Sequence, residues 1–417
     1  MPAADDEHAW VTAEAAARRS YGKLVAYLAR RTGDVAGAED ALSDAFAAAL
    51  LDWPAHGVPD RPEAWLMAVA RRKTIDAARR RRSSAQVAGH IQLISDELQQ
   101  LESADRIDIP DDRLALMFVC AHPAIDPTIR SPLMLQTVLG FDAATIASAF
   151  LVSPATMSQR LVRAKHKIRE AGISFQMPER ADLASRLDAV LAAIYAAFAE
   201  GWSDPASTET RRRNLGDEGI WLGRLVASLL PEEPEALGLL ALMLHAEARR
   251  GARRNGQGDY VPLAEQDPST WNDKLINEAE ALLRKASHTG MIGRYQIEAA
   301  VQSAHAARRI SGQTDWAAIA RMYDALLAIT ESPVVAINRA TAIAETDGAA
   351  VGLAALDALA DDRRLADYQP FWAARAGLLR LTGDVEAADK AYERAIGLEA
   401  DPAVRRFLQQ RRAELRR

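Results

Sequence analysis

Apolar residues recur at helical spacing along almost the whole chain, and no segment alternates apolar and polar residues between turns. One such stripe runs through Leu183, Leu187, Leu191 and Ile194, which stand three or four positions apart. Alanine, which favours helices most, is abundant, while aromatic residues make up only 6% of the chain. The sequence therefore predicts an all-α fold without a sheet. Its 417 residues are enough for two or three separately cored domains.

Several classes of protein are excluded by residue types that the chain lacks or carries once. Cys120 is the single cysteine, so neither an internal disulfide nor a cysteine-based zinc site is supported. The eight histidines show no metal-ligand spacing, and no nucleophile stands in a recognisable motif with a base. We therefore expect no enzyme activity, no catalytic residue, no cofactor and no metal.

The sequence also shows no feature of a membrane or secreted protein. Asp5, Asp6 and Glu7 stand where a signal peptide would be basic and then apolar. No apolar run approaches the roughly 20 residues that span a bilayer. We therefore expect a cytoplasmic protein with no membrane partner.

Charged residues are unevenly distributed along the chain, whose net charge is −6 at pH 7. Basic residues cluster within 61–90 and again within 153–170, whereas the charged residues within 83–112 are almost all acidic. Attraction to nucleic acid depends on where cations cluster rather than on their sum. The two basic clusters are therefore candidate nucleic-acid contacts, and the acidic segment is predicted to be a linker that ends in extended chain.

A pair of short helices is predicted around the second basic cluster. Asp142 is a good N-cap for a helix that ends near Phe150, after which the chain makes a tight turn. Ser153 and Pro154 start the next helix, because serine accepts free first-turn N–H groups and proline fits the first helical position.

The second helix of this pair has an apolar face and a polar face. Its apolar stripe is Met157, Leu161, Ala164 and Ile168. Such a helix suits the major groove of DNA, where glutamine pairs with adenine, arginine with guanine, and lysine contacts phosphates. The predicted DNA contacts are Ser153, Thr156, Gln159, Arg160, Arg163, Lys165 and Lys167. An ordinary pair of packed helices is the alternative.

The first basic cluster lies at the end of another predicted helix, which begins at Pro62. Its apolar strip is Trp65, Ala68 and Val69, and it closes with an arginine-rich run up to Arg82 that suits a phosphate backbone.

An acidic, alanine-rich helix is predicted upstream of that cluster. Its inward residues are Leu42, Ala45, Phe46 and Ala49. Glu39 and Asp40 are expected to lie outside, where a basic partner helix can dock.

The order of these segments resembles that of the sigma-70 family, and specifically its extracytoplasmic-function RNA polymerase sigma factors. The resemblance rests on Ala38-Glu39-Asp40, Asp44-Ala45-Phe46, Trp65-Leu66, Ala70-Arg71, Ile75-Asp76, Arg79-Arg80 and the helix end Arg160-Leu161-Val162-Arg163-Ala164-Lys165. The rest of the chain looks like the C-terminal extension of the subgroup that carries tetratricopeptide-like repeats.

The resemblance implies two small helical sigma domains followed by a helical repeat domain. Sigma region 2 is placed at residues 10–83, the acidic linker at 84–110, region 4 with its helix-turn-helix at 111–175 and the repeat domain at 180–417. Region 2 is implied to dock on the clamp helices of the polymerase β′ subunit and bind the minus-ten element. Region 4 is implied to contact the β flap and read the minus-thirty-five element.

Individual residues take roles from the same resemblance. Polymerase docking is assigned to Glu39, Asp40 and Asp44. Minus-ten DNA binding is assigned to Trp53, Arg61, Trp65, Arg71, Arg72, Lys73, Arg79 and Arg80, with residues 53–61 as a loop that holds a flipped base. The implied partners are RNA polymerase core and promoter DNA.

The C-terminal half shows spacing that is typical of stacked helix pairs. Gly383, Ala388, Tyr392 and Ala395 stand at the offsets that a tetratricopeptide-like pair uses for its turn and its core. Such repeats form a surface for peptides or other domains, so a regulatory protein or peptide is a candidate partner.

Three further features of the C-terminal half indicate where its helices are interrupted. Pro333 and Pro402 are predicted to close helical stretches, and Gly251 to Asp259 is predicted to be a flexible loop.

The sequence thus predicts a sigma factor that directs RNA polymerase core to specific promoters, with its C-terminal helical domain regulating it in cis. Two alternatives remain open. The first is a tetratricopeptide-like scaffold that binds protein partners without sigma activity. The second is a repressor or activator that binds duplex DNA without contacting polymerase.

Overall fold

The computed structural model describes Thr12 and residues 20–81, 112–150, 152–173, 175–176, 178–179, 182–202 and 210–415. Within these residues every regular element is a helix, apart from an isolated β-bridge between Arg254 and Tyr260. The predicted all-α fold is therefore confirmed for the described part of the chain. The predicted linker, 84–110, lies outside it. The chain divides into two compact units, residues 1–200 and 201–417.

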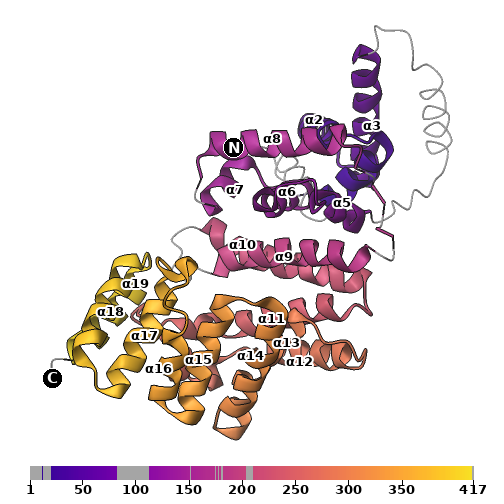
Figure 1. Cartoon of the computed structure of the whole chain (residues 1–417). Coiled ribbons are helices and arrows are strands. Elements are labelled where there is room, and N and C mark those ends of the chain that lie inside the picture. The colour runs from indigo at the N-terminus through magenta and orange to yellow at the C-terminus, as the bar shows by residue number, and fades with distance from the viewer. Residues whose placement is uncertain are drawn as a thin grey trace. The chain divides into compact units, whose positions relative to one another are not determined.

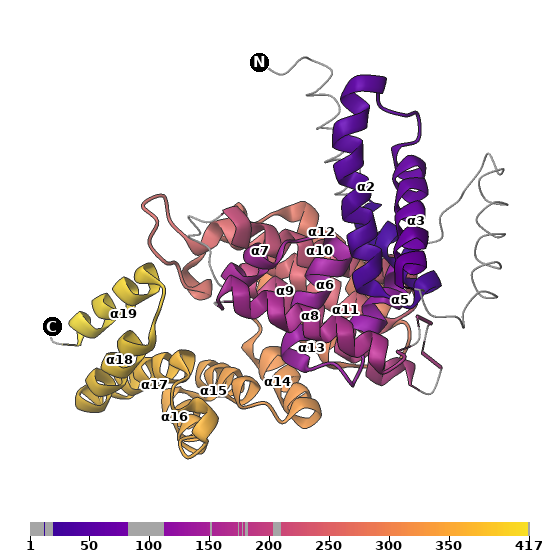
Figure 2. The same cartoon turned by 90° about the horizontal axis from the view of Figure 1, so that it is seen from above.

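In the described part of the first unit, residues 20–32 are helical, and α2 (Val35–His56) and α3 (Pro62–Arg81) follow. Asp34 caps α2 by accepting a hydrogen bond from the N–H of Gly37 at 3.0 Å. The helices α2 and α3 pack side by side as a hairpin (Figures 1 and 2).

The core face of α3 differs from the predicted strip. Leu66, Met67 and Ala70 are buried, whereas Trp65, Ala68 and Val69 are half-buried. The prediction was wrong because an apolar residue at helical spacing can lie at the edge of a contact as well as at its centre.

The second half of this unit comprises α5 (Arg113–Cys120), α6 (Pro127–Leu139), α7 (Ala143–Ala149) and α8 (Pro154–Glu170), and α9 (Leu183–Trp202) follows. Every residue from Leu114 to Cys120 is buried, so α5 forms the centre of this group. Gly140 ends α6 with a left-handed backbone (φ 76°), and its N–H donates to the carbonyl of Gln136.

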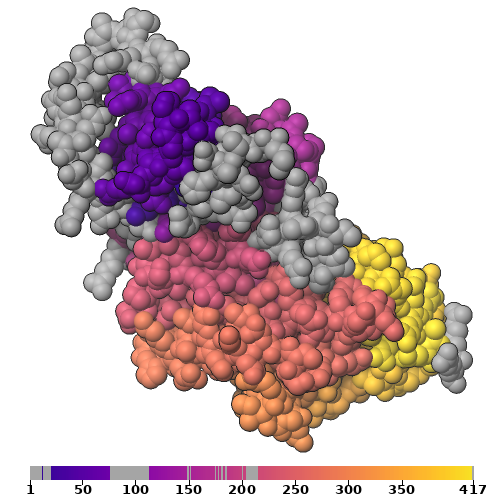
Figure 3. Space-filling model, turned by 180° about the vertical axis from the view of Figure 1, so that it is seen from behind, coloured from indigo at the N-terminus to yellow at the C-terminus, as the bar shows by residue number. Residues whose placement is uncertain are grey.

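The second unit is an array in which each helix packs on its neighbours in the chain (Figure 1). In the space-filling view its surface passes from rose through orange to yellow along the chain (Figure 3). Its α-helices are α10 (Thr210–Leu229), α11 (Pro234–Ala248), α12 (Asp273–Ser287), α13 (Arg294–Ser311), α14 (Trp316–Thr330), α15 (Pro333–Asp347), α16 (Ala349–Asp357), α17 (Gln369–Thr382), α18 (Val385–Leu398) and α19 (Pro402–Glu414). Because the contacts are between neighbours, the core is a series of small local clusters.

The spacing noted in the last helix pair corresponds to its packing. Gly383 ends α17 in a left-handed conformation (φ 84°), and Ala388, Tyr392 and Ala395 of α18 are buried in one cluster. Pro333 and Pro402 were misread, because they begin α15 and α19 instead of closing helical stretches. Proline fits the first helical turn, where its missing N–H would have had no intrahelical partner.

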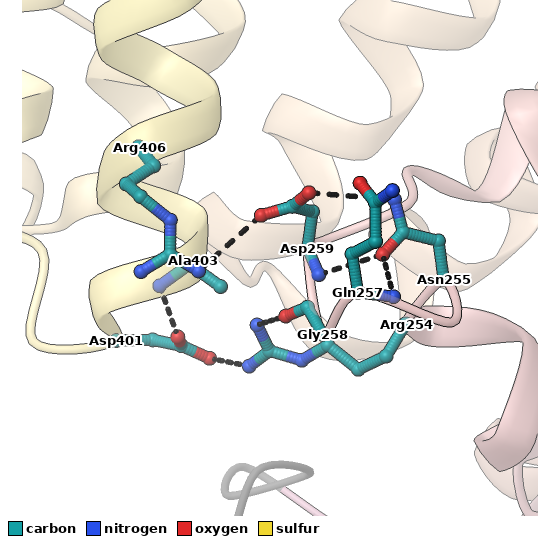
Figure 4. Close-up of polar contacts among 8 residues, drawn as sticks. All are labelled: Arg254, Asn255, Gln257, Gly258, Asp259, Asp401, Ala403 and Arg406. Atoms are coloured by element: carbon teal, nitrogen blue, oxygen red, sulfur yellow. Dashed lines mark hydrogen bonds and ion pairs between the residues drawn. The ribbon is translucent and has the colours of Figure 1, made fainter.

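The segment between α11 and α12 contains three short 3-10 turns, η1 (Arg250–Arg253), η2 (Leu263–Glu265) and η3 (Pro268–Thr270). It is a loop, as predicted, but it is anchored to α19 (Figure 4). The contacts are the ion pairs Arg254–Asp401 and Arg406–Asp259 (Nη2–Oδ1, 3.3 Å) and the edge-to-face rings of Tyr260 and Phe407 (centroids 5.5 Å apart). The loop therefore ties the start of the array to its last helix.

A buried histidine makes the stability of this unit dependent on pH. The ring of His305 in α13 meets the edge of Trp316, with centroids 5.3 Å apart. Burial, followed by the nearby Arg249 and Arg308, lowers the pKa of His305 from 6.5 to about 4. The unfolded chain therefore binds a proton at this position before the folded chain does, and stability is lost as the pH falls through this window.

We predict that His305→Phe, which keeps an aromatic ring against Trp316, flattens this pH dependence. Between pH 8 and pH 5.5 the native chain should lose about 1.4 kcal/mol more unfolding free energy than the variant. That difference corresponds to roughly 3–6 °C in the unfolding temperature of a unit of this size. Thermal unfolding of both proteins across this pH range measures it, and equal slopes would contradict the prediction.

Candidate functional site

The helices α7 and α8 form the pair that was predicted around the second basic cluster. Asp142 caps α7, accepting hydrogen bonds from the backbone N–H of Thr145 at 2.8 Å and from its hydroxyl at 2.7 Å. Ser153 caps α8 with its hydroxyl oxygen 3.2 Å from the N–H of Thr156, and Pro154 occupies the first helical position. The local capping signals in the sequence thus set both helix starts.

The side chains of α8 divide between two faces as predicted. Met157, Leu161, Ala164 and Ile168 are buried. The exposed residues of the predicted DNA contacts are Ser153, Thr156, Gln159, Arg160, Arg163 and Lys167. Arg163 donates to the side-chain oxygen of Gln159 at 3.4 Å, so these two groups lie next to each other one helical turn apart.

A cavity of about 370 Å³ beside α8 is lined by three of these cations. They are Arg160, Arg163 and Lys167, and the opposite wall comes from the turn before α6. Hydrogen bonds from Thr128 lower the pKa of Asp126 in that wall, with smaller effects of Arg160 and Arg130. The cavity therefore combines three cations with one ionised carboxylate, a charge balance that suits a phosphate group.

Lys165 is the exception among the predicted DNA contacts. Its Nζ lies 2.6 Å from Oε2 of Glu39 in α2, and the two side chains are only 13% and 8% exposed. The expectation that Glu39 lies outside was therefore wrong. Burial raises the pKa of Glu39, and the nearby Lys165 opposes that rise. Sequence patterns within one helix carry no information on this partner, which stands 126 positions away.

The other two residues assigned to polymerase docking are exposed on α2. Asp40 lies in the solvent, and Asp44 is 3.5 Å from Nζ of Lys73 in α3. Both members of this pair are about half exposed, so the attraction between them is weak and either can exchange its partner.

Residues assigned to minus-ten binding are divided between buried and exposed positions. Trp53 is 1% exposed inside α2, so it is not part of a loop, and its ring meets Trp65 edge-on with centroids 5.6 Å apart. Arg71 is also buried, where it donates to the hydroxyl of Tyr27 at 2.6 Å. Arg61, Arg72 and Lys73 are exposed. The side chains of Arg79 and Arg80 lie outside the described part of the structure.

Ion pairs between distant parts of the first unit were missed by the sequence analysis. Arg30 pairs with Asp112, and Arg169 at the end of α8 lies 3.8 Å from Asp34, the cap of α2. No local signal distinguishes these residues from other surface charges, because a partner distant in sequence is set by the packing of the helices.

The second unit contains an apolar groove of about 510 Å³ among α12, α13 and α14. Its lining includes Leu283, Ile292, Ile297 and Met322. Among the described residues no group of histidine, cysteine, aspartate and glutamate side chains could hold a metal ion. In that same part of the chain no helix is long and apolar enough to cross a membrane.

Two protein-family models match the chain. The model for sigma-70 region 2 matches residues 17–84, which include α2 and α3. A model described as a family of unknown function (DUF6596) matches residues 186–287, which run from α9 to α12.

The chain is also similar to curated proteins from two organisms. The uncharacterized protein R00370 of Rhizobium meliloti (strain 1021) is 40% identical over 365 residues, which make up 87% of this chain and 86% of that protein. The probable ECF RNA polymerase sigma factor SigI of Mycobacterium tuberculosis (strains CDC 1551 / Oshkosh and ATCC 25618 / H37Rv) is 30% identical over 174 residues, or 40% of this chain and 57% of that protein. No solved structure matches the chain.

The cap of α8 leads to a prediction about local stability. Ser153→Ala should cost about 1 kcal/mol in opening the first turn of α8, because the N–H of Thr156 loses its acceptor, while Ser153→Asp should keep the cap. Hydrogen exchange of the amides of Thr156 and Met157 should become roughly fivefold faster in the alanine variant. Equal exchange in the native, alanine and aspartate proteins would contradict this role of Ser153.

Proposed function

Because the chain belongs to one family with the Rhizobium protein R00370 and carries a sigma-70 region 2, we propose that it is an extracytoplasmic-function sigma factor. In this proposal it binds RNA polymerase core in the cytoplasm and directs it to specific promoters. The observation that carries the proposal is the match of sigma-70 region 2 to residues 17–84. It is supported by the exposed polar face of α8, which follows in the order that such a factor requires.

Promoter recognition at the minus-thirty-five element is assigned to α8 as the second helix of a helix-turn-helix. Gln159, Arg160 and Arg163 are exposed near its start, and their side chains suit adenine and guanine edges. Lys167 lies one turn beyond Arg163, a position that suits phosphate contacts.

At the minus-ten element we assign DNA contact to the exposed cations of region 2, Arg61, Arg72 and Lys73. The buried Trp53 and Arg71 are better explained as supports for the α2–α3 hairpin. Trp53 packs on Trp65, and Arg71 donates a hydrogen bond to the hydroxyl of Tyr27. Asp40 and Asp44 are exposed on α2 and provide an acidic surface for the polymerase clamp helices.

The second unit is proposed to regulate this activity in cis. Its apolar groove, with Ile292 77% exposed at its edge, supports binding of a regulatory protein or peptide. The same groove favours a second candidate function, a helical scaffold that binds protein partners without sigma activity.

The first test is transcription with purified core polymerase on genomic DNA fragments, followed by mapping of the start sites. The chain should co-purify with core and create new start sites. The double variant Arg160→Ala and Arg163→Ala should lower their use at least about tenfold, because a bidentate contact to a base contributes roughly 1–3 kcal/mol.

Ser158→Ala is the matched control, because Ser158 is exposed on the same helix and lies outside the predicted DNA contacts. Absence of co-purification would favour the scaffold. Tight binding of duplex DNA by the chain alone would favour a repressor or activator.

The second test addresses regulation in cis. Deletion of residues 203–417 should change promoter output with the same core polymerase. This truncation keeps α9, because Arg186 in α9 donates to the carbonyl of Phe118 at 3.0 Å. Ile292→Glu in the full chain should change output in the same direction if the groove is responsible. Unaltered output from the truncated chain would refute the regulatory role.

A further inference from the structure

The apolar groove of the second unit is enclosed by helices. Its lining residues on α12 lie within 280–287 and those on α14 within 318–325. Both helices pack on α13, which contributes Ile297 and Ala300 to the lining. On each wall the first and last lining residues are seven positions apart, which corresponds to about 10 Å along a helix. The walls are therefore as long as the apolar face of two helical turns.

Helical walls favour one backbone conformation in the occupant. The N–H and C=O groups of an α-helix bond mainly within the helix, so α12, α13 and α14 offer few backbone partners to an extended peptide. An amphipathic helix satisfies its own backbone and presents apolar side chains at positions i, i+3 or i+4, and i+7. That spacing matches the length of the walls, so the groove fits a helix better than an extended segment.

Exposed apolar side chains extend the groove at one end. Ile292 belongs to the lining and is 77% exposed, and Met291 before it is 63% exposed. On α14, Ile329 follows the lining residue Ala325 by four positions and is 52% exposed. A short turn joins α13 to α14, so the start of α13 and the end of α14 lie at the same end. Apolar side chains gathered in this way mark a contact surface.

Two arginines of the lining are available to a partner. Arg284 of α12 and Arg321 of α14 are exposed on opposite walls. Neither guanidinium forms an ion pair or a hydrogen bond with another of the described residues. Carboxylates that flank the apolar face of a bound helix would complement both charges.

The other polar side chains of the lining already have partners inside the unit. Bonding by His245 lowers the pKa of Glu280, with a further contribution from Ser303, so this carboxylate is ionised and engaged. The hydrogen bonds are Ser303 to Glu280 at 2.5 Å, Ser287 to the carbonyl of Arg284 at 2.7 Å and Gln296 to the carbonyl of Met291 at 2.9 Å. The groove thus offers apolar surface and two cations, against one carboxylate that is bonded to its own unit.

We propose that this groove binds an acidic amphipathic helix of a partner protein. The apolar residues of that helix lie between α12 and α14, and its carboxylates face Arg284 and Arg321. Apolar contact supplies most of the affinity, and the exposed arginines select the sign of the partner's charge. The inference deepens the regulatory role proposed for the groove and rests on that role only for its effect on promoter output.

The first experiment measures binding of two synthetic peptides to the full chain by fluorescence anisotropy. Each peptide has about 15 residues, long enough to form a helix, and carries leucine at i, i+3, i+7 and i+10. One has glutamate on its polar face and the other has lysine. The native chain should bind the glutamate peptide at least about tenfold more tightly at low salt. Equal binding of the two peptides, or binding of neither, would overturn the proposal.

Charge reversal on the walls tests the role of the arginines. The double variant Arg284→Glu and Arg321→Glu should reverse the order of affinities, so that the lysine peptide binds more tightly. Its matched control is Lys274→Glu with Arg363→Glu, which changes the net charge equally at exposed positions outside the groove. An unchanged order in the folded double variant, or the same reversal in the control, would contradict selection by the two arginines.

A second pair of variants tests where the peptide lies. Ala325→Gln places a longer side chain in the groove and should lower affinity for the glutamate peptide at least about tenfold, because it occupies the space of the apolar anchors. Ala328→Gln is the matched control, since Ala328 is exposed on the same helix and lies outside the lining. Undiminished binding by folded Ala325→Gln would overturn the proposal. Circular dichroism shows whether each variant folds.

Sedimentation velocity separates a partner helix from a second copy of the chain. The native chain and Ala325→Gln should sediment as the same species. Self-association of the native chain that Ala325→Gln abolishes would assign the groove to a second copy and overturn the proposal. All of these measurements are made without polymerase, so their failure leaves the sigma function standing. Absence of co-purification with core polymerase would overturn the sigma function and leave the peptide site standing.

Discussion

Each helix of this chain has an apolar face that water solvates unfavourably, and the fold is the set of helix contacts that covers those faces. In the second unit the cover comes mainly from the next helix in the chain, so the core is divided into local clusters. The stripe of α8 in the first unit is covered by the preceding helices α6 and α7 and also by α2, which lies far earlier in the chain. The first unit therefore adds long-range contacts between helices to the contacts between chain neighbours.

Polar side chains decide which of the possible contacts is made. Apolar burial is non-directional, whereas a buried charge is tolerated only where its partner stands in the right place. The Glu39–Lys165 pair fixes how α8 lies on α2, and Arg254–Asp401 joins the loop after α11 to α19. The first of these pairs holds a carboxylate and an ammonium group away from solvent where α2 and α8 meet.

The two family models match different parts of the chain. Sigma-70 region 2 matches the α2–α3 hairpin and its surroundings, whereas the family of unknown function begins within α9 and reaches α12. The exposed cations of the first unit lie on α3 and α8, and an apolar groove lies among α12, α13 and α14 of the second. The exposed cations of α3 and α8 and the apolar groove thus lie in different parts of one polypeptide.

The sequence by itself determined the helical class, the start of α7 at Asp142, the start of α8 at Ser153-Pro154 and the buried stripe of α8. These features depend on residues within one or two turns, whose periodicity and capping groups are visible in a single sequence. Only the tertiary structure decided that Glu39, Trp53 and Arg71 are buried, and that Lys165 faces α2 instead of solvent. The physical reason is that burial of a polar side chain depends on a partner brought close by folding, and Lys165 reaches Glu39 across 126 positions of sequence.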